Sequence, residues 1–125
     1  MSSIEPQMLK GVLALLLLRL VAEQEDYGYS LVQRLRAAGL PDAAEGSVYP
    51  ALARLEARGL VVPRMVREGR GPGRRYYSPS PSGVEEVVRL QLSWNAVSAA
   101  VRAAGTGRQD VHAGPGTVPV PSEGG

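Results

Sequence analysis

The chain has 125 residues, of which 44% are hydrophobic and 21% are charged, values that suit one small globular domain. It contains no cysteine, which excludes disulfide bonds, cysteine-ligated zinc, iron–sulfur clusters and thiol catalysis. The formal net charge is only +2, but residues 54–75 hold seven arginines and two glutamates, a local net charge of +5. So compact a positive segment favours a polyanionic partner.

A first helix is predicted over about Pro6–Ala22. Its apolar residues cover nearly every face, so this helix should be packed between other elements. The run is too short for a membrane span of about 20 apolar residues, and Arg19 interrupts it. A signal peptide is also disfavoured, because Glu23–Asp26 follows in place of a small-residue cleavage site. We therefore expect a cytoplasmic protein without a membrane segment.

Two shorter helices should follow. Glu25–Gly28 breaks the first helix, and a second is predicted over about Ser30–Ala38, where Gly39 ends it. A third helix should start near Ser47, with that serine as its N-cap. Pro50 would then lie in the first turn, where a missing N–H costs no hydrogen bond.

The third helix is predicted to have one buried side. Val48, Leu52 and Leu55 have the spacing of a single apolar stripe, and Gly59 should end the helix. Small and polar residues occupy the remaining faces: Ser47, Tyr49, Pro50, Ala53, Arg54, Ala57 and Arg58. A β-hairpin is predicted next, with strands over about Leu60–Glu68 and Arg74–Ser78.

A last helix is predicted from about Gly83 to Ala104, opened by Ser80-Pro81-Ser82. Apolar residues at alternating spacings of three and four form a seam on it: Val87, Leu90, Trp94, Val97 and Val101. A seam of about two heptads fits either a dimer contact or a stripe of the core. From residue 105 onwards, glycine and proline without periodicity predict a disordered tail.

The order helix, helix, turn, helix and hairpin predicts a winged helix-turn-helix, a mainly α (α+β) fold. We expect residues 1–79 to form a DNA-binding domain, residues 80–104 a dimerisation helix and residues 105–125 the tail. In this fold the third helix enters the major groove of double-stranded DNA, and a dimer reads two half-sites about 10 base pairs apart.

Candidate DNA contacts lie on the third helix and the hairpin. Tyr49 can donate its hydroxyl to a phosphate, and Arg54 can reach a phosphate or a guanine edge. Each also has a purely structural explanation: Tyr49 can be a half-buried packing residue, and Arg54 can belong to a solvated surface. Side chains alternate along a strand, so Arg74 and Arg75 should point to opposite faces, and one of them should touch DNA. The full set of predicted contacts is Tyr29, Ser47, Tyr49, Pro50, Arg54, Arg70, Arg74 and Arg75.

The chain resembles the PadR family of transcriptional regulators over about Met8–Ala104. The resemblance rests on SVYPALARLEARGL at residues 47–60, GRRYY at residues 73–77, Tyr29 and Gly83. It implies a homodimeric winged-helix repressor. We predict no cofactor and no metal site. The residues after Gly105 have no counterpart in this family.

Residues 92–94, Leu-Ser-Trp, resemble a smaller PadR subfamily of multidrug-responsive repressors. Dimers of that subfamily sandwich flat aromatic ligands between paired tryptophans, and Trp94 matches the tryptophan. The resemblance thus implies that a planar aromatic effector binds in an inter-subunit pocket and releases the protein from DNA. The residues that we predict for this pocket are Met8, Val12, Leu90, Trp94 and Val97. A tryptophan that only packs in the dimer core fits the same seam.

Two other classes of function compete. A small-molecule sequestering protein would use the inter-subunit cavity alone, but it would have no need of a +5 segment beside an exposed helix. An enzyme is disfavoured, because there is no cysteine and the single histidine, His112, lies in the predicted tail. The adjacent Glu85 and Glu86 splay apart on a helix and fit a solvated face.

Overall fold

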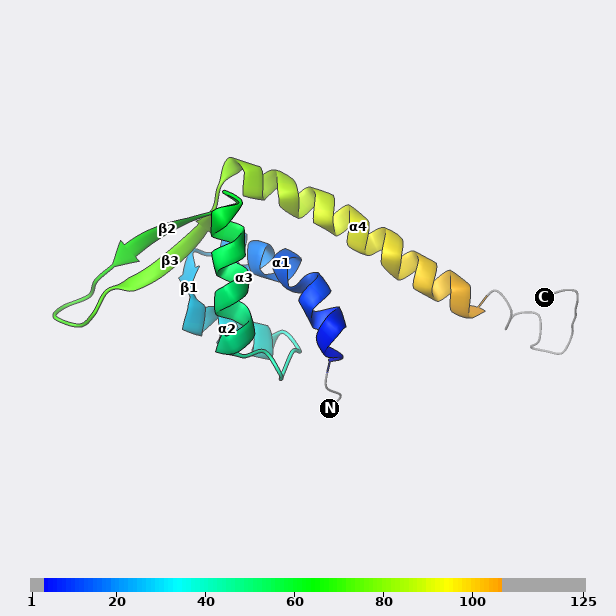
Figure 1. Cartoon of the computed structure of the whole chain (residues 1–125), viewed down its shortest axis with the longest axis horizontal. Coiled ribbons are helices and arrows are strands. Elements are labelled where there is room, and N and C mark those ends of the chain that lie inside the picture. Colours follow the sequence, from blue (N-terminus) through cyan, green and yellow to red (C-terminus); the bar gives the residue numbers. More distant parts are fainter. Residues whose placement is uncertain (1–3, 107–125) are drawn as a thin grey trace, which may run out of the picture. The chain divides into compact units, whose positions relative to one another are not determined.

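The computed structural model describes residues 4–106. The chain forms two compact units, Met1–Leu90 and Gln91–Gly125. The elements are α1 (Pro6–Glu23), β1 (Asp26–Tyr27), α2 (Gly28–Ala37), α3 (Glu45–Ala57), β2 (Val61–Val66), β3 (Arg74–Pro79) and α4 (Pro81–Thr106) (Figure 1). The first unit ends inside α4. The mainly helical winged-helix fold expected from the sequence is therefore confirmed.

The core of the first unit is built around α1. Leu17 and Leu18 are fully buried there, together with Leu31 of α2 and Leu52 of α3. Because α2, α3 and β3 all contact α1, apolar residues on several of its faces are covered, as its sequence predicted. No helix within residues 4–106 is long and apolar enough to span a membrane.

Two glycines end helices where the sequence predicted. Gly39 follows α2 with a φ of 116°, and Gly59 follows α3 with a φ of 74°, values that favour glycine. After α3, the amide of Leu60 donates to the carbonyl of Leu55 at 2.9 Å, the bond expected of a left-handed helix end. The chain is thereby turned directly from α3 into β2.

The start of α3 differs from the prediction. The helix begins at Glu45, with Ala44 as its N-cap, and Ser47 lies inside it without a capping role. The carbonyl of Ala44 accepts from the amides of Ser47 and Val48, both at 3.0 Å. The helix starts earlier than predicted because Ala43, just before it, is buried in the core and fixes the chain there. Pro50 therefore lies in the second turn rather than the first.

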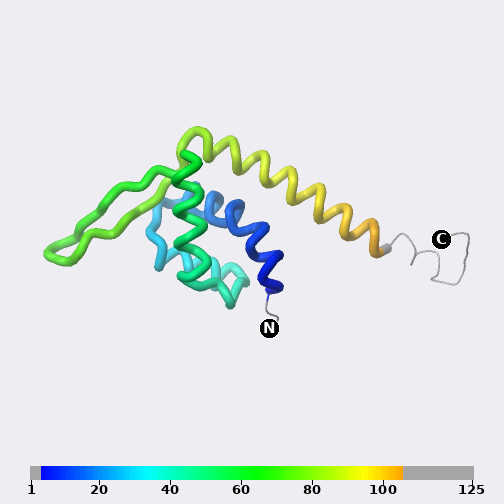
Figure 2. The backbone as a smooth tube through the Cα atoms, in the orientation of Figure 1, coloured from blue at the N-terminus to red at the C-terminus, as the bar shows by residue number. Residues whose placement is uncertain are grey.

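A three-stranded antiparallel sheet has the order β1-β3-β2. Strands β2 and β3 pair from Val61 opposite Pro79 to Val66 opposite Arg74, and we call these strands with residues 67–73 the wing (Figure 2). The sequence did not predict β1, which pairs Asp26–Tyr27 with β3. A two-residue strand is too short to show the alternation by which strands are recognised.

The beginning of α4 is tied to the end of α3. Ser80 caps α4, because its Oγ accepts from the amide of Gly83 at 3.0 Å and donates to the carbonyl of Gly59 at 2.6 Å. Glu86 accepts from Arg58 at 3.4 Å and from Arg89 at 2.6 Å, and Arg89 is the main cause of its lowered pKa. The helix runs from Pro81 to Thr106, so it exceeds the predicted range at both ends. The rest of the predicted tail, residues 107–125, lies outside the described residues.

Candidate nucleic-acid interface

Helix α3 presents a strip of small residues away from the core. Successive residues of an α-helix are rotated by about 100°. Val48, Leu52 and Leu55 therefore share the buried side. The opposite strip is exposed and consists of Gly46, Pro50, Ala53 and Ala57. Side chains this short allow a helix to approach the floor of a DNA groove closely.

One flank of that strip carries Tyr49. Its ring lies against Gly28 of α2, where an added Cβ would come within 2.7 Å of the tyrosine Cζ. Tyr49 nevertheless remains 43% exposed. Burial, followed by the charge of Glu45, raises the pKa of Tyr49. Its phenol hydroxyl is a donor that can reach a phosphate. Tyr29, in the first turn of α2, is also exposed.

The other flank of the strip carries Ser47 and Arg54. Both are exposed and line a groove of about 340 Å³ between α3 and α1. Lys10 lines the same groove from α1. Arg54 therefore lies on the flank of α3 that borders this groove and not on the central strip.

The wing is joined to α3 by an ion pair. Arg75 of β3 donates to Glu56 of α3 at 2.6 Å, and its guanidinium lies 5.9 Å from the ring centre of Tyr77. The hydrogen bond to Glu56 is the main reason why the pKa of Arg75 is raised. With its charge engaged by a carboxylate, Arg75 acts as a link between the wing and α3.

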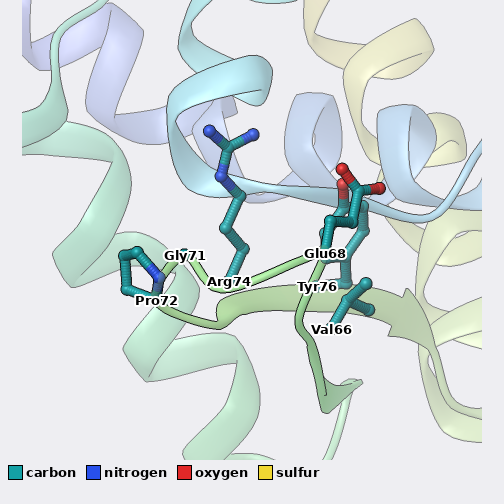
Figure 3. Close-up of a pocket in the computed structure, with 6 residues that line it drawn as sticks. All are labelled: Val66, Glu68, Gly71, Pro72, Arg74 and Tyr76. Atoms are coloured by element: carbon teal, nitrogen blue, oxygen red, sulfur yellow. The ribbon is translucent and has the colours of Figure 1, made fainter.

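Arg74 lies on the opposite face of the wing, as strand alternation predicted. Its guanidinium stands 4.6 Å from the ring centre of Tyr27, which itself contacts the Tyr76 ring at 5.2 Å. Arg74 also borders a pocket of about 140 Å³ (Figure 3). Glu68 and Tyr76 stand on the same side of the hairpin in that view. Arg74 thus lies over an aromatic face and, among the described residues, forms no ion pair.

A second ion pair holds the base of the wing to the chain before β1. Arg64 donates to both carboxylate oxygens of Glu25, at 2.7 and 2.8 Å. This bidentate contact lowers the pKa of Glu25. Within residues 4–106, Arg67, Arg70 and Arg74 form no ion pair, so they supply the wing's available positive charge.

Comparison with known proteins identifies the family. The sequence profile described as "Transcriptional regulator PadR-like family" matches residues 17–89. The crystal structure of a PadR-like transcriptional regulator from Bacillus cereus is 36% identical, covers 81% of this chain and 98% of its own, and superposes with a TM-score of 0.72. The chain belongs to the PadR-like family of transcriptional regulators.

Two further transcription regulators have similar structures. A Streptococcus transcriptional regulator is 37% identical in sequence to this chain. The alignment covers 81% of this chain and 99% of the Streptococcus chain, with a TM-score of 0.71. A PadR-like transcription factor from Bacteroides fragilis is 30% identical, with coverage of 79% and 95% and a TM-score of 0.68. Among curated proteins, none matches the chain.

The residues predicted for a ligand pocket fall in both units of this PadR-like protein. In the first unit Met8 is exposed, Val12 is half-buried and Leu90 packs against the core. In the second unit Trp94 and Val97 are exposed. No group of three or more histidine and acidic side chains that could hold a metal ion occurs within residues 4–106.

Sequence reasoning missed two participants of this PadR-like surface. One is Lys10, which has no motif around it and reaches the groove only because α1 packs on α3. The other is Glu56, which takes Arg75 out of the set of available cations. The sequence shows Glu56 as an acidic residue among several arginines, but the spacing of these residues does not reveal which arginine it contacts.

Proposed function

We propose that this PadR-like protein is a repressor that binds a pseudo-palindromic operator as a homodimer. The main support is α3, whose exposed strip of small residues is flanked by Tyr49 on one side and Arg54 on the other. The wing supports backbone binding through its unpaired arginines. In this proposal residues 1–79 bind DNA and residues 80–104 dimerise, so two α3 helices would enter successive major grooves.

Exposed apolar side chains support the homodimer. On α4 in the second unit, Trp94, Val97 and Val101 are 46%, 56% and 67% exposed. Three large apolar residues at helical spacing on one exposed face are typical of a surface that a partner covers. We propose that a second copy of the chain covers it.

The DNA-binding proposal predicts that Arg54→Ala combined with Arg74→Ala reduces operator affinity at least tenfold. Each lost phosphate contact should flatten the plot of log affinity against log salt by about 0.9. A gel-shift titration on the promoter of the protein's own gene, repeated at several salt concentrations, measures both quantities. Arg89→Ala, which removes a charge that is already paired on α4, is the matched control and should bind normally. No retardation of the wild type, or equal binding by the double variant, would sink the proposal.

We further propose that a planar aromatic effector stacks on the paired Trp94 rings and releases the operator. The support is the resemblance at residues 92–94 together with the exposed indole. Such a ligand shifts the DNA-competent population only by its difference in affinity for the two arrangements of the dimer.

The effector proposal predicts that planar aromatic dyes change the emission of Trp94, which is the only indole in the chain. Stacking on tryptophan is worth about 0.5–1.5 kcal/mol beyond area burial. Trp94→Ala removes both rings of the pair, about 1–3 kcal/mol in all, and should therefore need roughly 5- to 150-fold more dye to release the operator. Fluorescence titration and a dye-competition gel shift measure these effects. Unchanged emission with every dye tested would contradict a pocket at Trp94.

A further inference from the structure

The groove between α1 and α3 brings two cations together from different helices. Lys10 enters it from α1, and Arg54 enters it from α3. Ser47 and Gln7 add polar groups to the same lining, and Pro50 borders it at the edge of the small strip. Only the packing of α1 against α3 brings Lys10, 44 positions away in the sequence, beside Arg54.

The charge of this groove is not compensated by the protein. Among the described residues that line it there is no aspartate or glutamate. Neither Lys10 nor Arg54 forms an ion pair within residues 4–106, and both side chains are exposed. Two neighbouring cations without a counterion repel each other, so an anion that binds both relieves that repulsion.

The groove lies on the side of α3 away from the wing. Arg75 of the wing contacts Glu56, which shares a flank of α3 with Tyr49, whereas Arg54 is on the opposite flank. In Figure 1 the wing and the N-terminal half of α1 accordingly lie on either side of α3. A helix is about 10–12 Å wide and the major groove is about 12 Å wide, so a bound α3 meets one phosphate backbone along each flank.

We propose that the α1–α3 groove is a second backbone contact, in which Lys10 and Arg54 hold a DNA phosphate on the flank of α3 opposite the wing. The inference rests on the proposed function and deepens it by assigning a DNA-binding role to α1. The wing then holds one strand and α1 holds the other. Lys10 contributes affinity without sequence preference, since it reaches the backbone rather than the bases.

This contact is separate from the surface expected to dimerise. Met8 and Lys10 are two residues apart and so differ by about 200° around α1. Met8, predicted for the inter-subunit pocket, therefore faces away from the groove. A change at Lys10 leaves that surface intact, and the exposure of Lys10 makes its replacement compatible with folding.

The test compares Lys10→Gln with the wild type and with Arg89→Gln, which removes the same charge from an exposed arginine that is paired with Glu86 on α4. Operator affinity of the full-length protein is measured by fluorescence anisotropy between about 50 and 200 mM salt. Lys10→Gln should lower operator affinity at every salt concentration. Lys10→Gln combined with Arg54→Gln, which leaves the phosphate in each subunit without a cation, should flatten the slope of log affinity against log salt by about 2. Affinity for a scrambled duplex should fall by the same factor as affinity for the operator, while Arg89→Gln stays at the wild-type slope.

Two further variants locate the contact. Lys10→Glu should weaken binding more than Lys10→Gln, and the losses of Lys10→Gln and Arg54→Gln should not add, since both residues hold one phosphate. Wild-type affinity in Lys10→Gln, while Arg54→Gln weakens binding, overturns the role of α1 and leaves the proposed function standing. If the wild type binds no operator, both proposals fall together.

Discussion

Gly83→Ala should destabilise the protein by about 3 kcal/mol. The added methyl group would meet backbone atoms, which cannot move aside as the end of a flexible side chain can. A methyl group at this position would overlap the carbonyl oxygen of Leu60 and lie 3.1 Å from its carbonyl carbon. That oxygen already accepts from the amide of Ser80 at 3.1 Å, so it is held in place. A loss of this size corresponds to a fall in Tm of about 12 °C or more for a domain of this length.

Gly11→Ala is the matched control for Gly83→Ala. Both glycines lie in helices, but a Cβ at Gly11 would meet nothing within 4 Å. Alanine there should be neutral or stabilising by up to about 1 kcal/mol, since glycine costs a helix interior conformational entropy. Thermal unfolding at one fixed protein concentration compares the variants, because association with a second copy also changes Tm. Equal melting of both variants would show that Gly83 is not sterically required.

Arg34→Met should cost about 2–3 kcal/mol, less than the loss typical of a fully buried ion pair because Arg34 remains partly exposed. Arg34 donates to Asp26 at 3.1 Å, to Glu23 at 3.0 Å and to the carbonyl of Leu20 at 3.1 Å. It thus joins the end of α1 to β1 and α2. Asp26 is only 7% exposed, so removing the cation leaves a buried carboxylate with less compensation.

A double-mutant cycle separates charge from packing at this site. Asp26→Asn keeps an oxygen that can accept from the amide of Tyr27, so Arg34→Met should be better tolerated in that background. Arg89→Met removes an exposed partner of Glu86 and should cost less than about 1 kcal/mol. Urea unfolding of the four members of the cycle measures the coupling. Strictly additive losses would mean that Arg34 contributes mainly by covering apolar surface.

The position of Arg34 also matters for the candidate interface. The segment that it fixes, from Glu23 to Asp26, leads directly into Tyr27 and Gly28. Tyr27 stacks beneath Arg74 of the wing, and Gly28 packs against Tyr49 of α3. One partly buried guanidinium therefore supports both parts of the surface that we propose to bind DNA.

Most of the fold follows from local sequence signals. The apolar stripe of Val48, Leu52 and Leu55, and the glycines at 39 and 59, predict where helices run and end, because these signals act within one or two turns. The start of α3 was misplaced since it depends on the burial of Ala43, which is a tertiary effect. Strand β1 was missed because two residues become a strand only where β3 offers backbone groups to pair with.

The candidate site divides in the same way. By itself the sequence determined that a small-faced helix precedes an arginine-rich hairpin, and periodicity determined which side of that helix is buried. Only the tertiary structure decided what stands on each flank: Arg75 is engaged by Glu56, Arg74 lies over Tyr27, and Lys10 joins Arg54. The physical reason is that periodicity reports whether a side chain is covered by the core, whereas the partner of an exposed charge is set by elements that are distant in the chain and meet only after folding.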